Sequence, residues 1–103
     1  MQRILFIINP ISGTSRKGKV VNAIKRRIDH QRFAVEIRYT EYAGHAVEIA
    51  REAAETGFDI VVAVGGDGTI NEVARSLVHT QTALAIVPSG SGNGLARHLL
   101  IPM

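Results

Sequence analysis

The sequence predicts an α/β domain in which helices cover both faces of a mostly parallel sheet. Two observations lead to this prediction. Short apolar runs that suit buried strands alternate with segments whose apolar residues recur at helical spacing. The connections between them are rich in Gly, Ser, Pro and Asn, which favour turns. Repetition of strand and helix in this order is typical of a parallel sheet with right-handed crossovers.

The first strand and helix are predicted in the N-terminal third of the chain. Residues 3–8 consist of Arg3 and a continuous apolar run after it, as expected of a strand that is covered on both faces. Residues 9–15 are rich in Pro, Ser and Gly and read as a loop. A helix is predicted over 16–30, where apolar residues recur every three or four positions.

The second strand and helix have different patterns. Residues 33–39 alternate between apolar and polar side chains, which predicts a half-exposed strand near an edge of the sheet. The helix predicted over 43–56 carries a stripe of alanines, and small residues let a helix pack close to a sheet. Gly57 suits the C-terminal cap of this helix.

The remaining elements repeat the alternation. Buried strands are predicted at 59–64 and 83–87, with a helix over 69–78 between them. A second glycine-rich turn covers 88–94, and a fourth helix is predicted to begin at 95–99. The whole order predicts a Rossmann-like three-layer sandwich, in which ligands bind in the crevice at the carboxyl ends of the strands. Asn9–Gly13, Thr40, Gly65–Thr69 and Pro88–Gly94 all fall at that edge.

Length and composition fit one folded domain. The chain has 103 residues, of which 46% are hydrophobic and 20% charged, as in ordinary globular domains. Without cysteine it forms no disulfide, which fits a reducing cytosol. No apolar run approaches the roughly 18 residues of a membrane span. We therefore expect a cytoplasmic protein whose contact with the inner face of the membrane, where it occurs, is peripheral.

Positive charge is concentrated in one stretch of the chain. The net charge is +3, and six basic residues lie close together in sequence: Arg16, Lys17, Lys19, Lys25, Arg26 and Arg27. Such a face suits phosphates or an anionic membrane, but a solvated helix face is the simpler interpretation. The chain has three Phe and two Tyr, and none interleaves with the basic stretch, so we expect no nucleic-acid partner.

The turn between the third strand and the third helix is the most informative segment, Gly65-Gly66-Asp67-Gly68-Thr69-Ile70-Asn71-Glu72. A glycine-rich turn brings backbone N–H groups close to a phosphate and aims a helix N-terminus at its charge. Asp67 suits a hydroxyl, or a metal ion bridging to phosphate, better than direct phosphate contact. Thr69 and Glu72 also fit a capping box that satisfies the first N–H groups of the helix. The turn predicts a nucleotide-handling site.

Other motifs are incomplete. Residues 13–20 match the P-loop pattern except at Val20, which lacks the hydroxyl that binds magnesium. Residues 90–95 fail the dinucleotide fingerprint, because Leu95 stands where its third glycine belongs. The four histidines (His30, His45, His79 and His98) lack metal-ligand spacing and read as surface or helix-end residues, so no metal site built from protein side chains is predicted. Thr40 on its own fits an ordinary strand end.

Three segments together resemble the signatures of the diacylglycerol kinase catalytic domain family. They are Asn9-Pro10-Ile11-Ser12-Gly13, the turn at 65–73, and Pro88-Ser89-Gly90-Ser91-Gly92-Asn93-Gly94-Leu95-Ala96-Arg97. The family includes bacterial lipid kinases, sphingosine kinases and ceramide kinases, and is related to NAD kinases and phosphofructokinases. The resemblance covers essentially the whole chain. It implies the NAD kinase/phosphofructokinase-like N-terminal domain of an enzyme that transfers the γ-phosphoryl group of ATP to a lipid hydroxyl with Mg²⁺.

The resemblance also implies which residues act. The ATP site would be lined by Asn9, Pro10, Ile11, Ser12, Gly13, Thr40, Gly65, Gly66, Asp67, Gly68, Thr69, Ile70, Asn71, Glu72 and Ser91. Asp67 would be catalytic, as a base toward the acceptor hydroxyl or through magnesium. Many bacterial members carry Thr where this chain has Ser91, and the serine keeps the hydroxyl group. Many also carry Asp where this chain has Gly94, and the glycine lacks the carboxylate. The implied pathway is lipid metabolism and phospholipid biosynthesis.

Chain length limits these expectations. Enzymes of the family continue into a β-rich C-terminal domain that receives the lipid, and residues 1–103 correspond to the N-terminal nucleotide-binding domain alone. We therefore expect little kinase activity from these residues, and self-association through exposed apolar surface. The alternatives are an NAD-kinase-like enzyme with another acceptor, and a nucleotide-binding module without catalysis.

Overall fold

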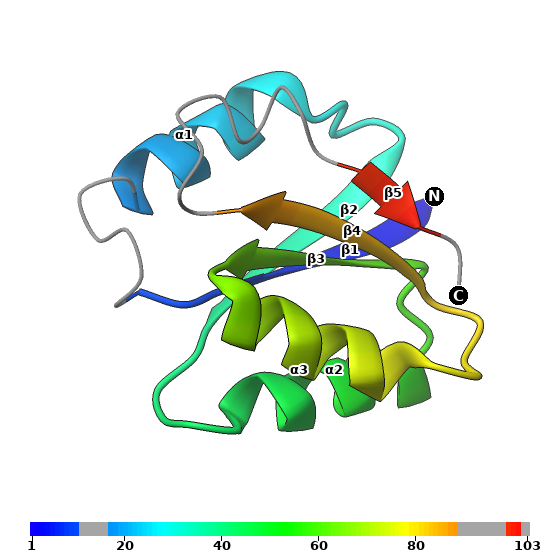
Figure 1. Ribbon diagram of the computed structural model, residues 1–103. Coiled ribbons are helices and arrows are strands. Elements are labelled where there is room, and N and C mark those ends of the chain that lie inside the picture. The colour runs from blue at the N-terminus through cyan, green and yellow to red at the C-terminus, as the bar shows by residue number, and fades with distance from the viewer. Residues whose placement is uncertain (11–16, 89–98, 102–103) are drawn as a thin grey trace.

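A five-stranded sheet with the order β2-β1-β3-β4-β5 forms the centre of the molecule (Figure 1). The computed structural model describes the backbone of residues 1–10, 17–88 and 99–101, and the side chains of 1–10 and 21–87. β1 (Gln2–Ile8), β2 (Phe33–Tyr39), β3 (Ile60–Gly65) and β4 (Ala83–Pro88) are parallel, and β5 (Leu99–Ile101) runs antiparallel to β4. The mostly parallel α/β sheet that the sequence predicts is confirmed.

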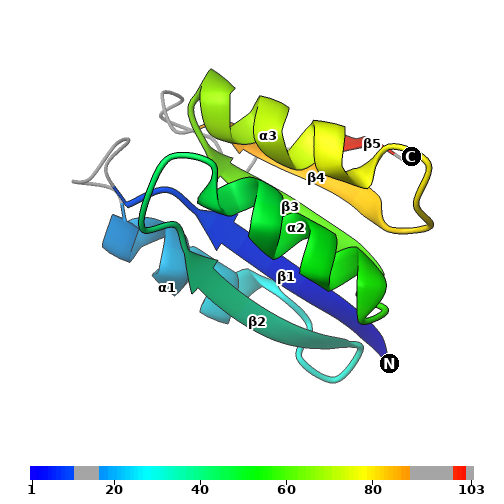
Figure 2. The ribbon, with the colours of Figure 1, turned by 90° about the horizontal axis from the view of Figure 1, so that it is seen from below.

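Helices lie on both faces of the sheet, as predicted. α1 (Lys17–Arg27) lies on one face, while α2 (His45–Glu55) and α3 (Asp67–Leu77) lie side by side on the other (Figures 1 and 2). None of the helices among the described residues is both long enough and apolar enough to cross a lipid bilayer.

Two apolar layers result from this arrangement, because successive side chains of a strand point to opposite faces. On the α1 side, Ile24 packs against strand residues that include Phe6, Val62 and Val64. On the α2 and α3 side, the alanine stripe packs as predicted, with Ala46, Ala50 and Ala53 buried against the sheet. The other members of this layer include Ile7, Val61, Val73 and Leu77.

β2 is the outer strand on one side of the sheet, and its burial alternates along its length as the sequence predicts. β1 and β3 are central and buried on both faces. The pairing of β1 with β3 runs from Ile4 opposite Ile60 to Ile8 opposite Val64. This register places the residues that follow both strands next to each other.

Helix boundaries differ from the prediction where the backbone turns. α1 ends at Arg27, and the chain then turns, with the amides of Arg32 and Phe33 bonded to the carbonyl of Asp29. α2 begins at His45, because Gly44 has a φ of 87°, which a helix interior does not allow. The C-terminal cap at Gly57 is confirmed by its φ of 86°.

The fourth helix predicted at 95–99 is wrong at Leu99. This residue belongs to β5, which pairs with the edge of β4: Leu99 lies opposite Ile86, Leu100 opposite Ala85, and Ile101 opposite Leu84. Main-chain bonding to an open strand edge therefore determines the backbone of these apolar residues. Residues 95–98 lie outside the described part of the chain.

Candidate functional site

Three loops meet at the carboxyl edge of the sheet. Asn9 follows β1, Thr40 follows β2, and Gly66 follows β3. The backbone ladder continues into these loops, since the Asn9 amide donates to the Val64 carbonyl (3.1 Å) and the Thr40 amide to the Ile8 carbonyl (2.9 Å). The chain passes from β1 to β2 on one side and then to β3 on the other. A reversal of this kind opens a crevice at the strand ends, which is where α/β proteins bind ligands.

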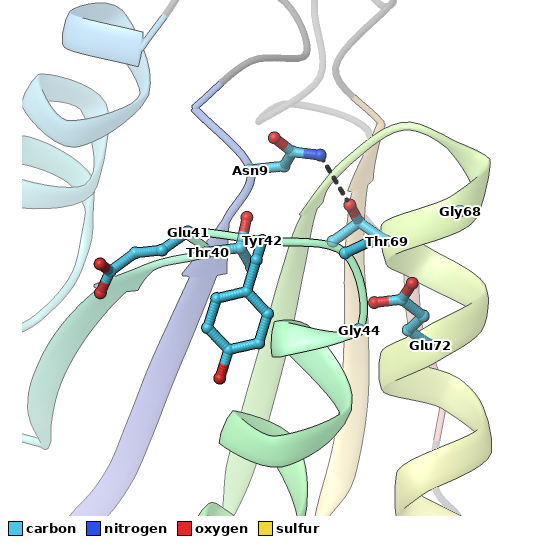
Figure 3. A pocket seen from close by; sticks show the side chains of 9 residues that line it. Asn9, Thr40, Glu41, Tyr42, Gly44, Gly68, Thr69 and Glu72 are labelled. Atoms are coloured by element: carbon cyan, nitrogen blue, oxygen red, sulfur yellow. Dashed lines mark hydrogen bonds between the residues drawn. The ribbon is translucent and has the colours of Figure 1, made fainter.

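A pocket of about 320 Å³ lies at this edge (Figure 3). Its lining comes from the residue after β1, from the loop between β2 and α2, and from the first turns of α3. The lining residues are Asn9, Thr40, Glu41, Tyr42, Ala43, Gly44, Gly68, Thr69 and Glu72. Five of them were predicted as site residues from the sequence: Asn9, Thr40, Gly68, Thr69 and Glu72. The predicted convergence of the strand ends is thus confirmed for β1, β2 and β3.

Asn9 and Thr69 connect two sides of the pocket. The Asn9 Nδ2 donates to the Thr69 Oγ1 at 3.2 Å, as Figure 3 shows. Thr69 is 7% exposed, and this bond satisfies a hydroxyl that burial would otherwise penalise. Because the Thr69 oxygen accepts from Asn9, its own O–H remains able to donate.

Gly65 makes room for this side chain. A Cβ at Gly65 would stand 3.0 Å from the Thr69 Cβ and 3.1 Å from its Oγ1, closer than real Cβ atoms normally approach. Gly68 differs, because a Cβ there would meet nothing within 4 Å. A side chain at the first glycine would crowd Thr69, whereas the second glycine leaves open space beside the pocket.

α3 begins two residues earlier than predicted, at Asp67. Its N-cap is Gly66, and no side chain caps it. The capping box predicted for Thr69 and Glu72 is therefore wrong: both residues lie inside the helix, and Thr69 bonds to Asn9 instead. The first N–H groups of a helix lack intrahelical partners, so an uncapped start presents donors and a partial positive charge to a ligand.

Other predicted site residues lie near the pocket without lining it. Asp67 is exposed at the first position of α3, and Asn71 is exposed one turn later. Ile70 packs against the apolar layer under α3, and Pro10 directly follows Asn9. Ile11, Ser12, Gly13 and Ser91 lie outside the described residues, so their roles stay predictions.

The loop between β2 and α2 was missed as a group, since only Thr40 was predicted there. Its residues Glu41 to Gly44 line the pocket without any motif of their own. Their position directly after β2, at the same edge as the other loops, was the available signal. The Glu41 side chain points away from Asn9 and Thr69, whereas Glu72 extends from α3 toward Gly44 (Figure 3).

An aromatic pair stands at the start of α2. The Tyr42 ring stacks on His45 with centroids 4.3 Å apart, and its hydroxyl donates to Glu48 Oε1 at 2.9 Å. That hydrogen bond raises the pKa of Tyr42 above the usual 10.0, and the negative charges of Glu48 and Glu41 act in the same direction. His45 is buried at the helix end, while His30 and His79 are exposed. Among the described residues, no three His, Cys, Asp or Glu side chains gather as metal ligands.

Comparison with known proteins gives one consistent family. The model of the diacylglycerol kinase catalytic domain matches residues 3–103. A diacylglycerol kinase of Bacillus subtilis (strain 168) is 36% identical over 104 residues, which cover 99% of this chain and 34% of that protein. Sphingosine kinase 1 of Arabidopsis thaliana is 33% identical over 110 residues, covering 99% of this chain and 23% of that protein.

A solved structure agrees with these relatives. The crystal structure of a diacylglycerol kinase from Bacillus anthracis str. Sterne superposes with a TM-score of 0.65 at 27% identity, covering 84% of this chain and 32% of that one. The chain thus spans about a third or less of the length of each of these three proteins.

Two glycines of one turn should respond oppositely to alanine. We expect Gly65→Ala to destabilise the fold by about 1–3 kcal/mol, because the new methyl group overpacks against Thr69. Gly68→Ala should stabilise it by up to about 1 kcal/mol, because alanine favours the helix and meets no obstacle. Urea unfolding measures both changes, and equal shifts of the two midpoints would contradict the packing described for Gly65.

The ionisation of Tyr42 should depend on Glu48. Glu48→Gln removes the charge that disfavours the phenolate, so the pKa of Tyr42 should fall toward 10.0. Only the neutral phenol of Tyr42 can donate the hydrogen bond to Glu48. The contribution of this bond to folding stability is therefore present below the ordinary pKa of tyrosine, and it is lost as the pH rises through the raised pKa of Tyr42 in the folded chain. Ultraviolet titration follows the phenolate, and Tyr42→Phe identifies its signal against Tyr39. An unchanged curve in Glu48→Gln would refute the assignment.

Proposed function

The chain belongs to the diacylglycerol kinase catalytic domain family, and from this premise we propose that it is the ATP-binding domain of a lipid kinase. The whole enzyme would transfer the γ-phosphoryl group of ATP to a hydroxyl of a diacylglycerol or sphingoid lipid. Residues 1–103 would form the N-terminal nucleotide-binding domain, and a β-rich C-terminal part would receive the lipid. The observation that carries the proposal is the pocket at the strand ends, where an uncapped helix start meets amide, hydroxyl and carboxylate side chains.

The start of α3 is suited to the phosphates. Its first N–H groups are free of side-chain caps, and the helix dipole favours negative charge at this end. Gly68 lines the pocket and leaves open space where a side chain would otherwise stand. A phosphate oxygen can therefore approach the backbone closely. This is the same arrangement that makes glycine-rich turns effective phosphate sites in other folds.

Side chains from the other loops would orient the nucleotide. Thr69 can donate its hydroxyl proton to a phosphate oxygen while Asn9 holds the Thr69 oxygen in place. Thr40 presents a second hydroxyl from the end of β2. Phosphoryl transfer needs mainly positioning and electrostatic stabilisation, and such fixed donors supply both.

The acidic residues fit a phosphate-bound magnesium ion. Mg²⁺ is commonly held by one or two carboxylates together with substrate phosphates, without a dedicated protein cage. Asp67 and Glu72 offer such carboxylates, and no larger acidic cluster occurs among the described residues. When bound, the ion would neutralise charge on the phosphates. A carboxylate base, with Asp67 as the candidate, would take the acceptor hydroxyl proton as the new O–P bond forms and the bond to the β–γ bridging oxygen breaks.

ATP binding tests the pocket directly. We expect the chain to bind ATP in the presence of Mg²⁺, and Gly68→Ala to weaken binding at least about tenfold, or about 1.4 kcal/mol, because its methyl group takes space needed by a phosphate. Arg75→Ala, exposed further along α3, is the matched control and should bind normally. Isothermal titration measures the affinities. Unchanged binding in Gly68→Ala would overturn this placement of the phosphates.

Catalysis should need more than these residues. We expect the 103-residue chain to bind ATP yet transfer no label from γ-labelled ATP to diacylglycerol, to a sphingoid base or to NAD, because the acceptor site would lie in the C-terminal part. Turnover of either lipid by this chain would refute the two-domain division, and phosphorylation of NAD would instead favour an NAD-kinase-like enzyme.

A further inference from the structure

One loop forms a whole wall of the pocket. Thr40 to Gly44 supply five of the nine lining residues. This segment connects β2 to α2 and belongs to neither element, so beyond Thr40 no strand or helix ladder holds it. Its first residue is fixed by the bond from the Thr40 amide to the Ile8 carbonyl. Glu41 to Gly44 need other contacts to hold their conformation.

His45 supplies three contacts to this loop. Its Nδ1 accepts the Glu41 backbone N–H at 2.9 Å, and its own backbone N–H donates to the Tyr42 carbonyl at 3.1 Å. The imidazole stacks on the Tyr42 ring at an interplanar angle of 14°, and Tyr42 is in turn bonded to Glu48 of α2. His45 is 8% exposed, beneath the wall that these residues form.

The chemistry of the ring fixes its protonation pattern. A backbone N–H can only donate, so Nδ1 must be the unprotonated nitrogen and Nε2 must carry the hydrogen. The ring therefore reaches back from the first residue of α2 to an amide that lies before the helix, and no side chain caps the helix itself. If the acceptor is removed, the partly buried Glu41 amide loses its partner and the loop loses a constraint next to Thr40.

We propose that His45 is a positioning residue for the nucleotide: it does not touch the ligand, but its Nδ1 fixes the Thr40–Gly44 wall in the shape that binds ATP. The inference rests on the proposed function, because it assigns the wall to the ATP site. It differs from a packing role in one respect. Packing needs the volume of the ring, whereas positioning needs an acceptor at the Nδ1 position.

Three substitutions separate these two requirements. His45→Asn places an amide oxygen where Nδ1 stands and loses most of the ring. His45→Gln places its oxygen near the Nε2 position, where the Glu41 amide does not point. His45→Phe keeps a ring that can stack on Tyr42 but offers no acceptor. Arg75→Ala again serves as the control away from the pocket.

The measurements are the ATP dissociation constant, the thermal midpoint, and hydrogen exchange of the Glu41 amide by NMR. We expect His45→Phe and His45→Gln to bind ATP at least about tenfold more weakly and to exchange the Glu41 amide at least about tenfold faster. His45→Asn should remain within about threefold of the unmodified chain in both respects, even where its thermal midpoint is lower.

Several outcomes would overturn the inference. Normal ATP affinity or normal Glu41 protection in His45→Phe would show that the acceptor is dispensable. An affinity in His45→Asn as low as in His45→Phe would show that ring volume is what matters. If the unmodified chain fails to bind ATP, the proposed function itself falls, and the inference with it. If the unmodified chain binds ATP and only the His45 variants behave otherwise than expected, the proposed function stands and this inference alone is refuted.

Discussion

The parallel pairing of β1 with β3 is the constraint on which the rest of the structure depends. Both strands are buried on both faces, so a shift of register by one residue would move each apolar side chain to the opposite layer. With Ile8 fixed opposite Val64, Asn9 must emerge next to Gly65. The bond from Asn9 to Thr69 follows from this placement. Burial of the central strands therefore determines the geometry of the polar site at their carboxyl ends.

The pocket is held together by different means in its different parts. The loop after β1 is tied to the first turn of α3 by a side-chain bond, and the turn after β3 depends on a glycine that admits Thr69. The loop after β2 depends on the ring of His45. Gly68 has no such packing role, because a Cβ there would meet nothing within 4 Å. Residues that shape the pocket can thus be distinguished from Gly68, which leaves open space beside it.

Much of this could be predicted from the sequence, for identifiable physical reasons. Strands buried on both faces leave continuous apolar runs, and the alternation at 33–39 revealed the edge strand. The start of α3 could not be read in the same way, because Thr69 and Glu72 match a capping pattern that the tertiary bond to Asn9 overrides. Leu99–Ile101 are apolar and few, so their pattern fits helix or strand equally, and pairing with β4 decides. The left-handed Gly44 and the wall beside it carry no signature at all.

The two outer strands of the sheet, β2 and β5, affect how the chain can associate with other molecules. An outer strand offers unpaired main-chain groups to which a second chain can add as a further strand. In β2, Glu36 and Arg38 are exposed at alternate positions, and Arg38 is paired with Glu52 of α2 at 3.5 Å. At the opposite border, the described residues of β5 are Leu99–Ile101. The charged side chains along β2 oppose sheet extension between copies at that border, so association there should involve side-chain surfaces rather than the edge of the strand.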